Sequence, residues 1–134
     1  METRDTNLLQ LRPFIKSETL KSRMTDEEFF QNKTLRPILA LQNDLLIEVF
    51  KHYIKKHKNV FYDFSIEKRL DYIDNAIHKD MKFRNSIKGI IIGQFTIAEH
   101  KLYVQHSSAL NKRMMHLVKE RLKSNIQVLQ VAVA

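Results

Sequence analysis

The sequence predicts an all-α protein, a compact bundle of about five helices preceded by an extended N-terminal arm. The chain of 134 residues has only two glycines and two prolines, whereas sheet proteins need turn residues at every hairpin. Apolar residues recur at helical spacing through most of the chain, and no convincing strand pattern accompanies them. Two segments, 25–28 and 96–99, read T-D-E-E and T-I-A-E, the pattern of a capping box at a helix N-terminus.

The length and composition indicate one folded domain. Apolar residues make up 43% of the chain and charged residues 28%, a balance typical of globular proteins. We place a flexible arm at residues 1–24 and a single helical domain at 25–134. The absence of cysteine excludes a disulfide framework and a thiolate site. No secretory signal or membrane-spanning stretch is evident, so we expect a cytoplasmic protein without membrane insertion.

The first half of the domain predicts three helices. A short helix runs from 26 to about 31, and a second from 36 to 57 with Pro37 in its first turn. Ser65 caps the third. The apolar stripe of the second helix is Ile38, Leu41, Leu45, Leu46, Val49, Phe50 and Tyr53, and the buried side of the third is Ile66, Leu70, Ile73 and Ile77.

The second half predicts a helix over about 80–92, another over about 97–106 and a last one from Ser107 or Ser108 to about 128. Gly93 falls where a left-handed C-terminal cap would end the first of these. Gly89 and Gly93 lack the strand-loop-helix context of a phosphate loop and sit in no membrane span. We therefore interpret them as helix-packing and capping residues. The tail 128–134 could extend the last helix, join a sheet edge or seal a dimer.

Basic residues provide the main indication of function. The net charge is +8, which favours an anionic partner such as RNA, DNA or an acidic protein, although a basic protein with solvated faces is the alternative. One cluster closes the second helix, another forms a stripe on the last helix, and residues 79–88 carry a third. The predicted anion-binding residues are Lys51, Lys55, Lys56, Lys58, Lys112, Arg113, His116, Lys119 and Lys123. Tyr53, Phe61 and Tyr62 near the first cluster could stack on unpaired bases.

Catalytic and metal sites have weaker support. Asp74 and His78, like Glu48 and His52, are spaced i,i+4 and could contribute to a metal site. A solvent-exposed acidic strip is the favoured account of Asp74 and His78, and Glu48 lies opposite the apolar stripe, on the solvated face of its helix. None of the six histidines belongs to a recognised catalytic motif. We therefore expect no catalytic residue, metal or cofactor. Gln42, Asn43, Arg121 and Asn125 interrupt apolar faces, and a buried Arg121 would need a partner such as Asp71 or Asp74.

Residues 32–127 resemble a family of small bacterial proteins of undetermined function, some of which are labelled glyoxalase. The resemblance is carried by KTLRPILALQNDLL, KKHKNVFY, KFRNSIKGIIIGQFT and SSALNKRMMHLVKERL. It implies a small helical protein and supplies no catalytic residues. Glyoxalase I-type enzymes are built from strand-rich βαβββ modules, whereas this sequence predicts helices.

Together these patterns predict a non-catalytic helical binding module whose basic faces engage an anionic partner, RNA or DNA first. The alternative is a homo-oligomeric interaction or regulatory protein that uses the Met114/Met115 helix and the tail as its interface. A metal-dependent enzyme built around Asp74 and His78 is a third possibility.

Overall fold

The computed structural model describes residues 2–15 and 23–130, and this part of the chain contains helices and no strand. The prediction of an all-α fold is confirmed, but the estimate of about five helices is too low. The α-helices are α1 (Glu2–Leu11), α2 (Asp26–Phe30), α3 (Arg36–Leu41), α4 (Asn43–Lys56), α5 (Ile66–Lys79), α6 (Met81–Ile92), α7 (Ile97–Gln105) and α8 (Ser107–Ser124). A π-helix (Gln31–Leu35) joins α2 to α3, and 3₁₀ turns occupy Val60–Asp63 and Ile126–Val128.

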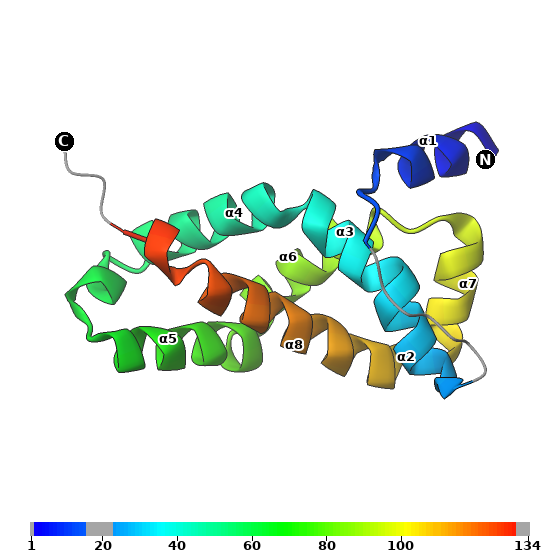
Figure 1. The fold of residues 1–134 in the computed structure, drawn as a ribbon. Coiled ribbons are helices and arrows are strands. Elements are labelled where there is room, and N and C mark those ends of the chain that lie inside the picture. Colours follow the sequence, from blue (N-terminus) through cyan, green and yellow to red (C-terminus); the bar gives the residue numbers. More distant parts are fainter. Residues whose placement is uncertain (1, 16–22, 131–134) are drawn as a thin grey trace.

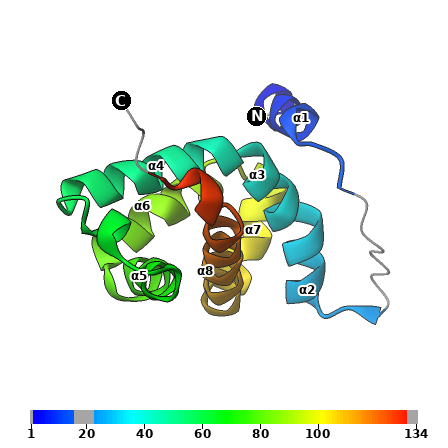
Figure 2. The same ribbon diagram turned by 60° about the vertical axis from the view of Figure 1, so that its left-hand side comes forward.

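Helix α8 forms the centre of the molecule (Figures 1 and 2). Helices α4 and α5 lie on opposite sides of it, α6 lies behind, and the π-helix, α3 and α7 also pack against it. Its inward positions are Leu110, Met114, Leu117, Val118 and Leu122, all buried. They meet buried isoleucines, leucines and phenylalanines from the surrounding helices, so the buried residues form one continuous hydrophobic core.

The predicted helix over 36–57 is divided in two at Gln42. This residue has φ −91° and ψ 5°, outside the helical range, and its side-chain amide donates a hydrogen bond to the Ile90 carbonyl oxygen at 3.3 Å. The break redirects α4, and Leu45 is 47% exposed instead of lying in the apolar stripe. A polar residue at the centre of the stripe thus marks the bend.

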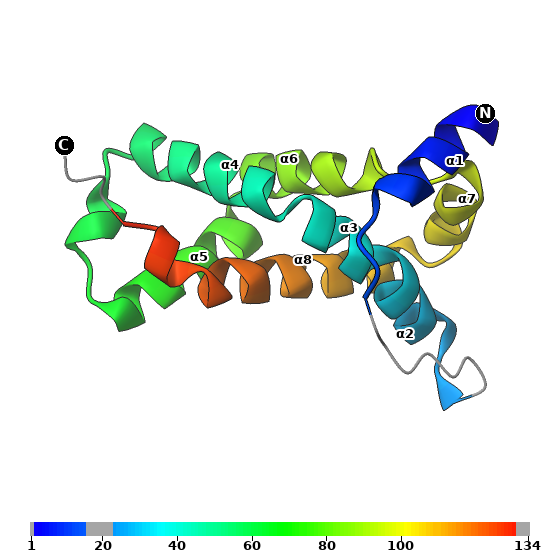
Figure 3. The same cartoon turned by 45° about the horizontal axis from the view of Figure 1, so that its top comes forward.

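The N-terminal segment is helical rather than extended over Glu2–Leu11, as Figure 3 shows. Arg4 donates to the carbonyl oxygens of Phe95 and Gly93, and Asp5 accepts from the Ile97 backbone N–H. Just beyond α1, Arg12 forms a two-point ion pair with Glu99 at 2.7 Å. Polar anchors rather than an apolar stripe hold this helix in place, which is why hydrophobic periodicity did not predict it. The division at residue 24 stays a prediction.

The two glycines do not pack against another helix. Gly89 is exposed, and a Cβ added there would meet nothing within 4 Å. Gly93 does end α6, but with φ −60° rather than in the left-handed conformation. The predicted role in close helix packing is therefore wrong, while the predicted end of the helix is confirmed. The expected caps at Thr25, Ser65 and Thr96 are all present.

Candidate anion-binding surfaces

The first basic group lies at the C-terminal end of α4. Lys55, Lys56 and Lys58 are exposed, and no carboxylate lies within ion-pairing distance of them in the described parts of the chain. Lys51, one turn earlier, is 3.8 Å from Glu48. The helix ends with two consecutive residues in the left-handed conformation, Lys58 (φ 64°) and Asn59 (φ 59°). This turn leaves the three free lysines together at one end of the molecule.

A cavity of about 190 Å³ lies beside Lys56, between α4 and α6. It brings Lys56 together with Lys82, a member of the third basic cluster. Asp80 is the carboxylate in its lining, and its oxygens accept from the Phe83 backbone N–H at 3.1 Å and from the Tyr53 hydroxyl at 3.0 Å. The backbone hydrogen bond from Phe83 is the main factor that lowers the pKa of Asp80. The carboxylate is thus held by the fold, while both lysines remain available. The lining residues are Val49, His52, Tyr53, Lys56, His57, Asp80, Lys82, Phe83 and Ser86.

The three aromatic residues near this group differ in accessibility. Phe61 is fully buried, so its predicted role in base stacking is wrong. Tyr62 is half-buried against Phe61, with ring centroids 5.6 Å apart. Tyr53 is also half-buried, and burial followed by the hydrogen bond to Asp80 raises its pKa. Of the three, Tyr53 alone lines the cavity beside Lys56.

The second basic group, the stripe on α8, is largely engaged within the protein. Lys123 and Lys119 lie 2.8 Å and 3.6 Å from the same oxygen of Asp74 on α5. Arg113 donates to the Gln31 side chain at 3.0 Å, and His116 lies 3.2 Å from Glu120. The remaining member, Lys112, is exposed.

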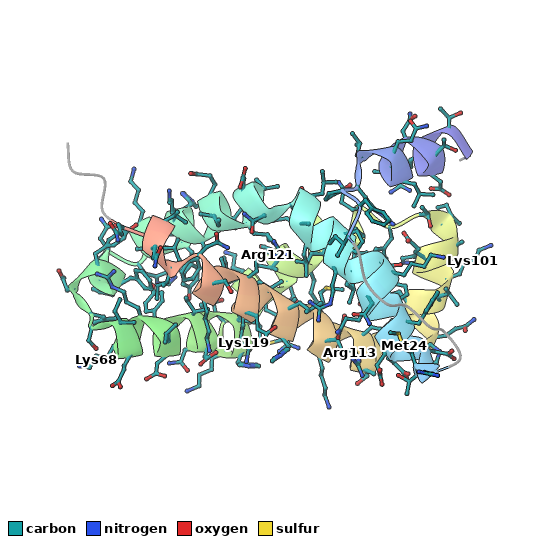
Figure 4. The ribbon with its side chains drawn as sticks, in the orientation of Figure 1. Met24, Lys68, Lys101, Arg113, Lys119 and Arg121 are labelled. Carbon is teal, nitrogen blue, oxygen red and sulfur yellow. The ribbon has the colours of Figure 1, made fainter. Side chains whose placement is uncertain are left out.

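The structure does not bring the two groups together. Figure 4 shows Arg113 and Lys119 on the side of α8 turned away from α4. A partner that bridges both groups would have to reach around the molecule, so the two groups are separate candidate surfaces.

Asp74 and His78 form contacts with lysines rather than a metal-ligand set. Nζ of Lys119 lies 2.8 Å from Nε2 of His78, which acts as an acceptor when the imidazole is neutral. Burial, then Lys119 and Arg84, lower the pKa of His78 and favour this neutral form. No group of three histidine, aspartate or glutamate side chains that could hold a metal occurs among residues 2–15 and 23–130.

Arg121 lacks the carboxylate partner that the sequence suggested. Its Nη1 donates to the Asn43 side-chain oxygen at 3.1 Å, whereas Asp74 pairs with Lys123. A cavity of about 250 Å³ opens beside it, and Arg36 also lines this cavity. The sequence marked Arg121 as anomalous but gave no indication of Arg36, because the two residues are distant in the chain.

The alternative of an oligomer interface on the helix of Met114 and Met115 stays a prediction, but these two side chains do not contribute to it. Met114 and Met115 are 0% and 1% exposed, so they belong to the core of the protomer. Of the tail, Leu129 is buried and residues 131–134 lie outside the described part of the chain. No helix in the described residues is long and apolar enough to span a bilayer.

Comparison with known proteins gives no independent assignment. No protein family, curated protein or solved structure matches the chain. The resemblance noted from the sequence therefore stays an expectation, and the geometry of the basic surfaces is the main indication of function.

Proposed function

We propose that this protein is a non-catalytic helical module that binds the phosphate backbone of RNA or DNA through the basic end of α4. The observation that carries the proposal is the group Lys55, Lys56 and Lys58, which is exposed and forms no ion pair with a carboxylate of the described residues. Lysines that are already paired gain little from a new anion, whereas unpaired ones release counterions from a polyanion. The α8 stripe is therefore the secondary contact in this proposal.

Lys82 and Tyr53 support the same surface. Lys82 comes from α6 and shares a cavity with Lys56, so cations from two helices face one hollow. The half-buried ring of Tyr53 also lines that hollow, with its centroid 4.2 Å from the ring centroids of His57 and Phe83. A groove with cations and an aromatic side chain is typical of proteins that bind single strands with little sequence preference.

The test compares two double variants that remove the same charge. Lys55→Gln/Lys56→Gln changes the proposed surface. Lys33→Gln/Lys101→Gln changes two exposed lysines, one on the π-helix and one on α7, elements that Figure 1 shows at the opposite end of the molecule from the C-terminal end of α4. Binding to a labelled 20-nucleotide single-stranded RNA would be measured by fluorescence anisotropy at several salt concentrations. Two lost phosphate contacts would make the slope of log K against log salt shallower by about 1.4.

The control variant is expected to keep the wild-type slope. Equal losses in both variants would show that only net charge matters and would reject the α4 surface. Wild-type protein that fails to bind the RNA and a duplex DNA of equal length at 50 mM salt would reject the proposed function itself.

A further inference from the structure

Arg121, in the last turn of α8, is a half-buried cation whose charge is not balanced by a carboxylate in the described chain. Its hydrogen bond goes to the neutral amide of Asn43, whose oxygen also lies 3.4 Å from Nδ2 of Asn125. Burial and then the charge of Arg36 lower the pKa of Arg121, so the surroundings oppose the charged form. The carbonyl end of α8 offsets only part of this cost.

Arg36 brings a second cation to the same place. It comes from the start of α3, and its Nε donates to the side-chain oxygen of Asn32 at 3.0 Å, which is again a neutral acceptor. The only carboxylate in the cavity lining is Glu120, which is 59% exposed and 3.2 Å from His116. Two arginines thus line one cavity, and neither forms an ion pair with Glu120 or with another carboxylate of the described residues.

The cavity has the size and chemistry for a small anion. Its volume of about 250 Å³ is below the roughly 300–1,000 Å³ of pockets for drug-sized ligands. Leu39 and Leu117 supply apolar wall, and Ser124 and Asn125 supply polar groups next to the arginines. Guanidinium groups present planar pairs of donors that match the oxygens of a phosphate.

We propose that the cavity between α3 and α8 is a binding site for a phosphate group, which Arg36 and Arg121 hold between their guanidinium groups. Such an anion would supply the charge that the protein itself does not provide. The site is separate from the α4 surface and does not depend on the proposed function. The phosphate group could be free inorganic phosphate or part of a larger molecule such as a nucleotide.

The test is isothermal titration calorimetry with inorganic phosphate and with adenosine 5′-monophosphate, and with acetate as a control for ionic strength. We expect saturable binding of at least one phosphate compound and none of acetate. Binding of both compounds with equal affinity indicates free phosphate as the ligand, and tighter binding of the nucleotide indicates a phosphate carried on a larger molecule.

Two matched pairs of variants locate the site. Arg36→Gln is expected to weaken phosphate binding at least tenfold, whereas Lys112→Gln removes one exposed charge from α8 and is expected to change it less than twofold. Ser124→Asp places a carboxylate in the cavity and should abolish binding, while Ser124→Asn has nearly the same size and should retain it. Arg121→Gln should also weaken phosphate binding, but the loss of its hydrogen bond to Asn43 could unfold the protein. The Arg36 and Ser124 variants therefore test the location of the site without it.

Absence of saturable phosphate binding to the wild-type protein would overturn the proposal. So would equal affinities in wild type and Arg36→Gln, or equal affinities in Ser124→Asp and Ser124→Asn, because each result would place the anion elsewhere.

Discussion

Glu99 connects the N-terminal helix to the rest of the fold, and replacing it with glutamine tests this directly. Its two oxygens accept from Arg12 at 2.7 Å each, and it also receives hydrogen bonds from the Thr34 hydroxyl at 3.0 Å and the Thr96 backbone N–H at 2.8 Å. The side chains of Arg12 and Glu99 are 6% and 15% exposed. The pair is therefore buried, and removing one charge leaves the other without compensation.

The expected loss of stability in Glu99→Gln depends on which contacts of Glu99 the glutamine amide can still make. Glutamine serves as well as glutamate in a capping box, so Glu99→Gln retains the α7 cap and loses the charge that faces Arg12. Breaking a buried pair costs about 3–5 kcal/mol, and we expect the lower end, about 3 kcal/mol, because release of α1 lets Arg12 reach water. For 134 residues this corresponds to a fall in Tm of about 10 °C.

Chemical denaturation and amide hydrogen exchange provide the assay. Protection of residues 2–11 should fall in Glu99→Gln, because α1 is attached mainly through these polar contacts, while protection of α8 should fall only with the loss of global stability. Thr34→Val, which removes one hydrogen bond and no charge, is the control and should cost about 1 kcal/mol. A loss below 1 kcal/mol in Glu99→Gln, with α1 still protected, would refute the reasoning.

The same pair predicts a pH dependence. The contacts with Arg12, Thr96 and Thr34 outweigh burial and lower the pKa of Glu99 from its ordinary 4.5. A carboxylate with a lowered pKa stabilises the fold above its unfolded value, and this contribution is lost as the pH falls through the folded value. The stability difference between wild type and Glu99→Gln should thus be constant above about pH 5 and shrink in more acidic solution.

Two further predictions concern backbone conformation and are checked by urea denaturation. Gly89 is an exposed helix-interior glycine with open space at its Cβ position, so Gly89→Ala should raise the free energy of unfolding by about 1 kcal/mol. In Gly93→Ala the new Cβ would lie 3.1 Å from the Gly89 carbonyl oxygen, so this variant should gain less stability. A larger gain from Gly93→Ala than from Gly89→Ala would contradict the structure. Lys58 has a φ of 64°, so Lys58→Gly should stabilise by about 1 kcal/mol. His57→Gly, at φ −99°, should destabilise by about 0.5–1 kcal/mol, and equal effects of the two glycines would argue against the left-handed turn.

Local patterns account for what the sequence predicted correctly. A capping box needs only four consecutive residues, so the start of α7 at Thr96 could be read directly, and the structure has both of its hydrogen bonds. Apolar periodicity likewise predicted Ile73 and Ile77 on the core face of α5, because such a stripe depends on positions one turn apart, although Ile66 in the first turn of the same stripe is 58% exposed. The break at Gln42 was not predicted, since a hydrogen bond to a carbonyl in α6 defines it.

Contacts between distant residues account for what was missed. Arg12 and Glu99 are 87 positions apart, and Arg121 and Asn43 are 78 apart. Without an alignment of related sequences, no pattern in one chain links such pairs. The sequence could show that Arg121 is out of place on an apolar face, but the choice of Asp74 as its partner rested on residue type alone. In the fold, Asp74 faces Lys119 and Lys123 instead.

The basic residues behind the net charge of +8 therefore fall into groups with different roles in the structure. Several arginines form contacts within the fold. Arg4 and Arg69 donate hydrogen bonds to backbone carbonyl oxygens, and Arg12 forms an ion pair with Glu99. The lysines at the end of α4 are left facing solvent, and a flexible, strongly hydrated ammonium group suits loose, salt-sensitive contact with a polyanion. Arg121 fits neither group, because it is half-buried and hydrogen-bonded to Asn43 but has no carboxylate partner among the described residues. A salt titration of the polyanion complex and a titration with phosphate thus probe different parts of one basic protein, and Lys55→Gln/Lys56→Gln should change the first result while leaving the second intact.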